Sequence, residues 1–179
     1  RHHAAMPHAE VSGFMKALRE REAASALALR WLILTATRVS ETLGSDWSEI
    51  SLEDATWSIP GSRMKTGEPH TVPLSDECLE ILAQLDTDTG LLFQNNGRKL
   101  STGVFSALFK RMNVTGVTSH GFRASFRTWV DEATRTPGHV AEKCLAHKIP
   151  HAVERAYRRS ALLDLRRDLM QQWADYIGQ

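Results

Sequence analysis

The 179-residue sequence lacks several features that define whole classes of protein. Its two cysteines, Cys78 and Cys144, are too few for a disulfide scaffold and form no metal or redox motif. The one long apolar run, residues 27–36, is interrupted by Arg30 and is too short to cross a bilayer. The first ten residues hold no apolar stretch like that of a signal peptide. These absences favour a reduced, cytoplasmic protein with no metal centre and no membrane partner.

A strong net charge is also missing, because the formal sum is only +1. Taken alone, this sum argues against a nucleic-acid partner. The distribution is uneven, however. Residues 98–127 contain no acid but carry Arg98, Lys99, Lys110, Arg111, Arg123 and Arg127, and a second basic cluster holds Arg155, Arg158 and Arg159. One-sided basic patches are therefore compatible with the near-neutral sum, although a solvated helix face is the simpler interpretation of any single cluster.

The apolar residues, 42% of the chain, predict a mostly helical α+β domain with a small antiparallel sheet. The apolar spacing predicts helices at residues 11–21, 22–37, 38–44, 76–85, 101–111, 119–133, 140–146, 152–159 and 162–176. Between them, segments rich in β-formers and split by Pro and Gly predict three short strands at 47–51, 56–59 and 70–72. A turn at KTGE precedes the last strand and predicts a hairpin.

The segment TSHGFRASFRTWVDEA, residues 118–133, contains the first candidate site. At helical spacing, His120 and Arg123 lie on a basic stripe beside the apolar face. With Thr118 or Ser119 as the N-cap, both would lie in the first turn, where backbone N–H groups already attract anions. Cations are mildly unfavourable there. The pair therefore indicates either an anion-binding site or an ordinary surface histidine and arginine.

Four other residues are candidates, each with a simpler alternative. Arg38 follows an apolar helix and needs an anionic partner, which Glu41 can supply as a buried pair. Lys65 lies at the expected hairpin tip, as an ordinary exposed turn lysine also would. His147 ends a short helix, and Tyr157 lies among three arginines but also suits a core aromatic position.

The order Arg…Lys…His-x-x-Arg…His…Tyr resembles that of the tyrosine recombinases, the phage integrase family. In this sequence the pattern consists of Arg38, Lys65, His120, Arg123, His147 and Tyr157. The segments RMKTGEPHTVPLS, HGFRASFRTWVDE, EKCLAHK, VERAYRRS and RRDLMQQWADY are similar to integrases of prophages and genomic islands in proteobacteria. The resemblance covers nearly the whole chain. It departs at Ala36 and Ala146, where family members often have glycine.

The resemblance implies the DNA breaking-rejoining fold, a helical catalytic domain with a three-stranded antiparallel sheet. It assigns residues 11–179 to that domain and residues 1–10 to the end of an interdomain linker. The arm-binding and core-binding domains that precede the catalytic domain in such integrases are expected to be absent from this chain.

The resemblance also implies that DNA strands are cut and rejoined without metal, ATP or another cofactor. Arg38, Arg123 and His147 would bind the non-bridging oxygens of the phosphate. Lys65 would protonate the departing 5′-oxygen, and His120 would assist proton transfer at the tyrosine. Tyr157 would be the nucleophile that forms a 3′-phosphotyrosyl intermediate. Tyr176, on the apolar stripe of the last helix, is expected to be structural.

The partners implied are double-stranded DNA at attachment sites and accessory host or excisionase proteins. A tetramer would assemble on DNA through the C-terminal segment, whereas the isolated domain is expected to be a monomer with that segment packed on itself. Three alternatives stay open at this point. They are a DNA-relaxing topoisomerase with the same tyrosine chemistry, a DNA-binding module that has lost catalysis, and a helical interaction domain.

Overall fold

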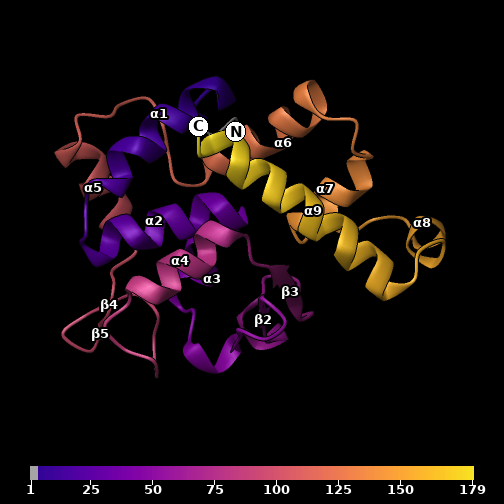
Figure 1. Ribbon diagram of the computed structural model, residues 1–179, viewed down its shortest axis with the longest axis horizontal. Coiled ribbons are helices and arrows are strands. Elements are labelled where there is room, and N and C mark those ends of the chain that lie inside the picture. The colour runs from indigo at the N-terminus through magenta and orange to yellow at the C-terminus, as the bar shows by residue number, and fades with distance from the viewer. Residues whose placement is uncertain (1–3) are drawn as a thin grey trace.

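The computed structural model describes residues 4–179, in which most helices pack together and a small sheet lies at one side of them (Figure 1). The α-helices are α1 (His8–Arg19), α2 (Ala24–Thr35), α3 (Val39–Leu43), α4 (Asp76–Gln84), α5 (Val104–Arg111), α6 (Gly121–Ala133), α7 (Gly138–Cys144), α8 (His151–Arg155) and α9 (Arg159–Ile177). The strands are β1 (Ile50–Ser51), β2 (Thr56–Ile59), β3 (His70–Pro73), β4 (Gln94–Asn95) and β5 (Arg98–Lys99). Two 3-10 turns, Trp47–Glu49 and Gly61–Arg63, complete the described part.

The innermost element is α2, in which every residue from Ser25 to Thr35 is buried. A helix that is apolar on all sides has to be covered on all sides. Helices α1, α4, α5 and α9 contact it, and Figure 1 shows α2 between α1 and α4. On α9, the Trp173 indole Nε1 donates to the carbonyl of Ile33 at 2.9 Å, so α9 is fixed to α2.

The three-stranded sheet has the order β1-β2-β3 and is antiparallel throughout. Ile59 pairs with His70 at the loop end of the β2–β3 hairpin, and Thr56 pairs with Pro73 at its open end. At the tip, the Gly67 N–H donates to the Met64 carbonyl at 3.0 Å, and Gly67 has φ +76°. Glycine adopts that left-handed conformation without steric cost. The structure therefore confirms the hairpin and its turn, with the third strand extended to Pro73.

The expected strand at residues 47–51 is wrong over its first three residues. Trp47–Glu49 form a 3-10 turn, because the Asp46 carboxylate accepts from the Ser48 N–H at 2.9 Å and the Glu49 carboxylate accepts from the Asp46 N–H at 3.1 Å. This reciprocal capping satisfies the backbone locally, without a ladder partner. Only Ile50 and Ser51 pair with β2.

The expected helix at residues 152–159 is also wrong at its end. Helix α8 stops at Arg155, and Arg158 is extended (φ −65°, ψ 144°) as the residue that precedes α9. An extended residue cannot continue a helix, so the chain changes direction over residues 156–158. Tyr157 consequently lies in the connection between α8 and α9, not within a helix.

The segment expected to be a linker packs against α6 where it is described. The Thr118 N–H donates to the Ala4 carbonyl at 3.0 Å, and the Ser125 hydroxyl donates to the Met6 carbonyl at 2.5 Å. A β-carbon on Gly121 would lie 2.3 Å from the Ala4 oxygen, so this approach requires glycine. Helix α1 begins at His8, and residues 1–3 of the expected linker lie outside the described residues.

Helix α9 packs on its own domain along most of its length. Leu162, Leu169 and Trp173 are buried, whereas Leu165 is 39% exposed. Tyr176 stacks on Trp129 and its hydroxyl lies 2.7 Å from His8 Nδ1. Tyr176 therefore occupies a packing position, as its place on the apolar stripe predicted.

None of the helices described within residues 4–179 combines the length and the apolar character that a bilayer span demands.

Candidate active site

Helix α6 begins with a turn that places Arg123 inside the domain. The sequence predicted Thr118 or Ser119 as the N-cap, but the N-cap of α6 is His120. The Thr118 hydroxyl instead accepts from the N–H of Gly121, the first helical residue, at 3.0 Å. His120 precedes the first helical residue and is exposed, whereas Arg123 is only 6% exposed. Because the two residues differ so much in burial, His120 and Arg123 do not form one surface stripe.

The Arg123 guanidinium bridges the C-terminal ends of two other helices. Nη1 donates to the carbonyl of Ala36, the cap of α2, at 2.5 Å, and Nη2 donates to the carbonyl of Leu145, the cap of α7, at 2.8 Å. Helix C-termini carry partial negative charge and favour a cation. These two carbonyls therefore fix the fork of Arg123 relative to the core helix.

Burial, together with the charge of Arg38, lowers the pKa of Arg123 to about 10. The group still carries its full charge at neutral pH. Among residues 4–179 no carboxylate forms an ion pair with it, which is uncommon for a buried arginine. The site is therefore prepared for an anion that the chain itself does not supply.

Arg38 lies close to Arg123, at the start of α3. Its Nη1 donates to Glu41 Oε1 at 3.1 Å, and its backbone N–H donates to Glu41 Oε2 at 2.9 Å. The pair with Glu41 that the sequence suggested is therefore present. The Arg38 side chain remains 22% exposed, and its charge acts on Arg123 directly. Two neighbouring cations repel each other, and a bound anion would relieve that repulsion.

His147 completes the cluster at the end of α7. Its Nε2 lies 3.3 Å from Arg123 Nη2, and its Nδ1 lies 2.6 Å from Glu142 Oε2. Because a guanidinium has no acceptor, Arg123 donates to Nε2 and the ring donates from Nδ1 to Glu142. This arrangement corresponds to a neutral imidazole with its proton on Nδ1.

Lys65 and Tyr157 lie outside this hydrogen-bonded cluster. Lys65 is exposed at the hairpin tip. Tyr157 is half-buried, with its ring centroid 5.1 Å from that of His139. Within the described part of the chain, no hydrogen bond or ion pair joins the Tyr157 side chain to Arg38, Arg123 or His147. The structure thus brings Arg38, Arg123 and His147 together. Lys65 lies on the hairpin, and Tyr157 lies on the connection between α8 and α9.

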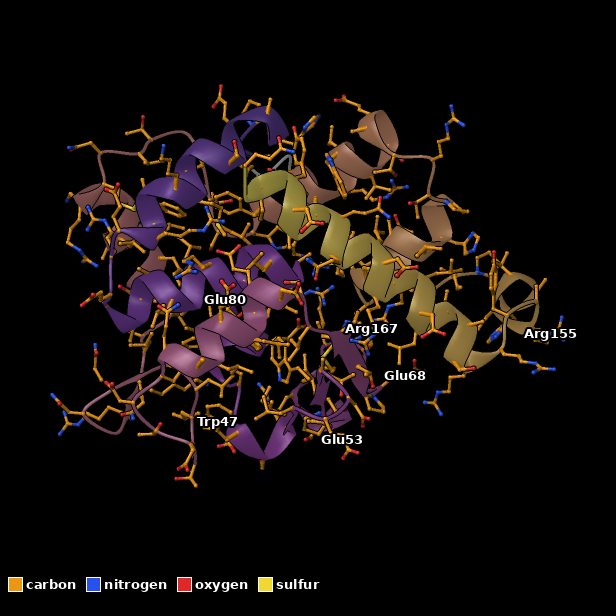
Figure 2. The ribbon with its side chains drawn as sticks, in the orientation of Figure 1. Trp47, Glu53, Glu68, Glu80, Arg155 and Arg167 are labelled. Carbon is orange, nitrogen blue, oxygen red and sulfur yellow. The ribbon has the colours of Figure 1, made fainter. Side chains whose placement is uncertain are left out.

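A cavity of about 820 Å³ adjoins His147 and extends between the hairpin, α7 and α9. Thr66, next to Lys65 in sequence, lines it from the hairpin, and Arg166 lines it from α9. Other basic side chains around the cavity are Lys143, Lys148 and Arg159. Figure 2 shows Glu68 of the hairpin beside the first half of α9, with Arg155 of α8 beyond the start of that helix.

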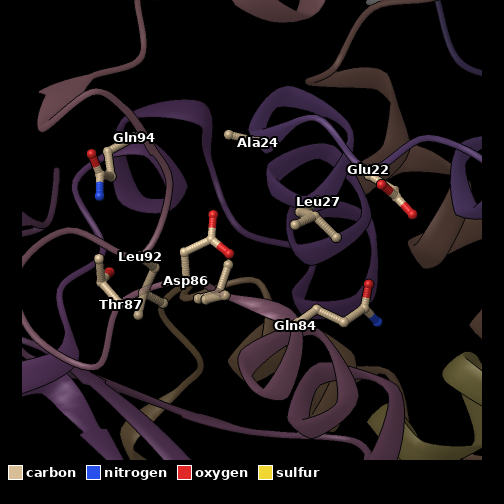
Figure 3. Close-up of a pocket in the computed structure, with 9 residues that line it drawn as sticks. Glu22, Ala24, Leu27, Gln84, Asp86, Thr87, Leu92 and Gln94 are labelled. Carbon is tan, nitrogen blue, oxygen red and sulfur yellow. The ribbon is translucent and has the colours of Figure 1, made fainter.

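Two further cavities are acidic. One, of about 340 Å³, lies between the start of α2 and the segment after α4, and its lining includes Asp86 and Glu22. Figure 3 shows the Asp86 carboxylate near the centre of this cavity and the Glu22 side chain directed away from it. The other, of about 420 Å³, is lined by Asp76, Glu77 and Glu80. Neither contains a candidate residue, and carboxylates repel a phosphate backbone. Among residues 4–179 no group of three His, Cys, Asp or Glu side chains is arranged to bind a metal.

Comparison with known proteins identifies the family. The family model described as "Phage integrase family" matches residues 4–162. The chain belongs to the phage integrase family. It is 37% identical over 183 residues to the prophage integrase IntZ of Escherichia coli (strain K12), with 98% of this chain and 45% of the relative covered. It is 38% identical over 154 residues to the prophage integrase IntA of the same strain, with 82% and 37% covered. The chain thus spans less than half the length of these relatives.

Solved structures agree with the family fold. A lambda integrase tetramer bound to a Holliday junction has a TM-score of 0.63 at 20% identity, with 83% of this chain and 48% of that chain covered. The XerH site-specific recombinase bound to its difH substrate has a TM-score of 0.64 at 16% identity, with 92% and 53% covered. At these identities the likeness is one of fold, and it confirms the helical integrase domain with a small sheet.

The two alanines that depart from the family pattern both occupy left-handed backbone positions. Ala36 has φ 52° and Ala146 has φ 56°. A left-handed residue other than glycine costs about 1 kcal/mol. Ala36 is the residue whose carbonyl binds Arg123, and Ala146 directly precedes His147. The phage integrase domain therefore keeps the helix ends that shape the site even without glycine.

Three residues near the cluster are not predicted by the sequence. Glu142 binds His147, and His70 and Arg166 line the cavity that adjoins His147. Burial, with the charges of Arg166, Arg123 and Arg38 nearby, lowers the pKa of His70 to about 3. Only Glu142 had a usable signal in the sequence, because it stands five residues before His147 at the end of a helix.

Proposed function

We propose that this chain is the catalytic domain of a site-specific DNA recombinase that integrates and excises a prophage or genomic island. The observation that carries the proposal is the Arg123 guanidinium, which is buried, charged and, within residues 4–179, without a carboxylate partner, beside Arg38 and His147. Membership of the phage integrase family and the names of its relatives as prophage integrases support this function.

In this proposal the two arginines and His147 bind the non-bridging oxygens of one phosphodiester. A guanidinium fork matches the geometry of phosphate, and a buried cation acts more strongly than an exposed one. Because carbonyls already hold Arg123, little reorganisation is needed as negative charge develops on phosphorus. The cluster would thus supply the charge neutralisation that many nucleases obtain from metal ions.

Tyr157 is proposed as the nucleophile. Its hydroxyl oxygen forms a bond to phosphorus while the bond to the 5′-oxygen breaks, which leaves a 3′-phosphotyrosyl link. His120 takes part in removing the tyrosine proton, and Lys65 gives a proton to the departing 5′-oxygen. The phosphodiester energy is retained in the new link, so a 5′-hydroxyl from another strand can reverse the step. The hairpin tip and the α8–α9 connection would bring Lys65 and Tyr157 to the phosphate held by the cluster.

Double-stranded DNA is the proposed partner. A lambda integrase neighbour is bound to a Holliday junction and the XerH neighbour to difH, and the basic lining of the cavity beside His147 suits the same kind of ligand. We further propose assembly of a tetramer on DNA through the C-terminal segment, together with accessory host or excisionase proteins.

A suicide-substrate assay tests the function directly. The full-length protein is mixed with attachment-site DNA that carries a nick beside the cleavage point, so that the short 5′-hydroxyl strand diffuses away and the covalent adduct accumulates. The wild type is expected to form the adduct, and Tyr157→Phe is expected to form none. Tyr176→Phe is the matched control and should retain the adduct, because Tyr176 packs on Trp129. Adduct formation by Tyr157→Phe, or its loss in Tyr176→Phe, would overturn the assignment.

A second assay separates recombination from simple relaxation of DNA. The recombinase is expected to exchange strands between two attachment sites on separate molecules. A protein that only relaxes a supercoiled plasmid and never joins two sites would instead be a topoisomerase with the same chemistry. A protein that binds DNA without any adduct would be a silent binding domain.

A further inference from the structure

Glu142 connects the catalytic cluster to the outer face of α6. Its Oε2 lies 2.6 Å from His147 Nδ1, and its Oε1 accepts from Arg127 Nε at 2.7 Å. Arg127 also forms an ion pair with Asp131 on its own helix. A continuous series of charged contacts therefore runs from Asp131 through Arg127 and Glu142 to the ring of His147.

The backbone of Glu142 also holds His147. The His147 N–H donates to the Glu142 carbonyl at 2.9 Å, and the Ala146 N–H donates to the Lys143 carbonyl at 3.0 Å. With Ala146 left-handed, these two bonds form a Schellman motif at the end of α7. Glu142 thus fixes both the position of the His147 backbone and the rotation of its ring. Few side chains in a site are constrained from both sides by one residue.

We propose that Glu142 is a positioning residue that presents His147 Nε2 to the phosphate and supports His147 as a proton donor once the phosphate is bound. This inference rests on the proposed recombinase function. Glu142 does not touch the phosphate in this scheme, and it acts only through the imidazole. Arg127 holds the carboxylate in place from its other side.

The charges around His147 explain why such support is needed. In the structure His147 Nε2 accepts from Arg123, which disfavours a proton on that nitrogen. A phosphate oxygen that binds Arg123 replaces Nε2 as the acceptor, so Nε2 can then take a proton and donate to the phosphate. The resulting imidazolium lies among cations from several elements. Arg123 contacts the ring and Arg127 contacts its partner Glu142, while the cations that line the adjoining cavity are Lys143, Lys148, Arg159 and Arg166.

Within residues 4–179, the acidic groups near His147 that oppose these cations include Glu68, Glu142 and Glu154. Glu142 contacts Nδ1 directly, whereas Glu68 and Glu154 line the adjoining cavity, and Glu154 pairs with Lys143. His70 also lines the cavity, and burial keeps it neutral at physiological pH. Burial raises the pKa of Glu142, but hydrogen bonds from Arg127 and His147 outweigh it and lower that pKa overall. Glu142 is therefore the anion that stabilises a protonated His147.

The test is Glu142→Gln, which keeps the shape and an acceptor oxygen but removes the charge. In ¹⁵N NMR spectra the wild-type His147 ring is expected to carry its proton on Nδ1, and Glu142→Gln should weaken that preference, because a carboxylate binds the Nδ1 proton more strongly than a neutral amide does. On nicked attachment-site DNA, the maximal rate constant for adduct formation should fall about tenfold at neutral pH, while the DNA concentration that gives half the maximal rate changes little. A merely structural role would not change the tautomer of the ring.

The matched control is Glu132→Gln, which removes the charge from another His–Glu pair, between His8 and Glu132 at 2.8 Å. It should leave both the His147 tautomer and the rate constant for adduct formation unchanged. Glu142→Asp keeps the charge and should recover part of both effects, and it replaces Glu142→Gln if that variant does not fold.

An unchanged His147 tautomer in Glu142→Gln overturns the inference, as does a Glu142→Asp variant that recovers none of the lost rate. The tautomer is measured on the protein without DNA. If the wild type forms no adduct at all, the proposed function fails, while the tautomer still decides the role of Glu142.

Discussion

The arginine cluster and the segments that carry Lys65 and Tyr157 are held in opposite ways. Arg123 is buried and bound by the caps of α2 and α7, and Arg38 is paired with Glu41. Lys65 is exposed on a turn, and Tyr157 lies in a connection where its ring contact is His139. The phosphate-binding half is part of the folded core, whereas the half that would make and break bonds lies on surface segments.

This difference separates two physical requirements. Stabilising a developing charge works best when the charged groups are fixed in advance, because no reorganisation is then needed in the transition state. A nucleophile and a proton donor act at particular strand positions, and connections outside the core can change conformation without unfolding it. Substitutions in the cluster should therefore lower both stability and activity. Substitutions on the outer segments should change activity without changing stability.

The largest expected effect of a substitution in the cluster is that of Arg123→Lys. A lysine reaches one of the two carbonyls and leaves the other buried without a donor, which costs about 1–3 kcal/mol of unfolding free energy. The phosphate also loses its fork, so adduct formation should slow by about 10²–10³-fold. Urea unfolding and the suicide-substrate assay measure both. Arg111→Lys, exposed at the end of α5, is the control and should change neither. Near wild-type values for Arg123→Lys in both assays would contradict the fixed cluster.

Lys65→Ala is expected to affect activity alone. The side chain is exposed, so the unfolding free energy should stay within about 0.5 kcal/mol of the wild type. Adduct formation should slow by about 100-fold, because the 5′-oxygen loses its proton donor. A substrate with sulfur in place of that oxygen needs no proton on leaving and should restore the rate. Failure of the sulfur substrate to restore it would show that Lys65 is not the general acid.

At neutral pH a substitution of His70 should give the smallest effect, and its effect on stability should grow only as the pH falls. Burial, with Arg166, Arg123 and Arg38, holds its pKa at about 3, while in the unfolded chain it titrates near its ordinary value of about 6.5. Between these values the unfolded chain binds one more proton, so this group lowers the unfolding free energy by about 1.4 kcal/mol per pH unit as the pH falls. Urea unfolding at several pH values should show a shallower decline in His70→Gln. Equal declines in the two proteins would exclude a buried neutral His70.

The sequence alone predicted the helical domain and the β2–β3 hairpin, which are local or depend on strong patterns. Arg38, Arg123 and His147 were joined into one site only through the resemblance to the family. The all-apolar α2 segment has to be a core helix, and KTGE with its glycine suits a hairpin turn. Within helix α6, the apolar spacing correctly placed Phe126 and Trp129 inward.

What the sequence could not predict depends on contacts between distant segments. Arg123 looked like a surface residue, because nothing near it in sequence shows that the carbonyls of Ala36 and Leu145 enclose it. From the sequence, His70 is an ordinary strand residue, because nothing near it in sequence shows that Arg166 of α9 lies close to it. The wrong strand start at Trp47 has a local cause, since the Asp46 cap outweighs the β preference of the following residues. The catalytic roles of all six candidates remain predictions.

The most direct test of the account is to locate the covalent bond between protein and DNA. The adduct from the suicide-substrate assay is digested with protease and nuclease, and the peptide that retains a 3′-nucleotide is sequenced by mass spectrometry. The account predicts that the nucleotide is attached through phosphate to Tyr157. Attachment to Tyr176 or to any other residue, or an adduct that still forms when Tyr157 is phenylalanine, would contradict it.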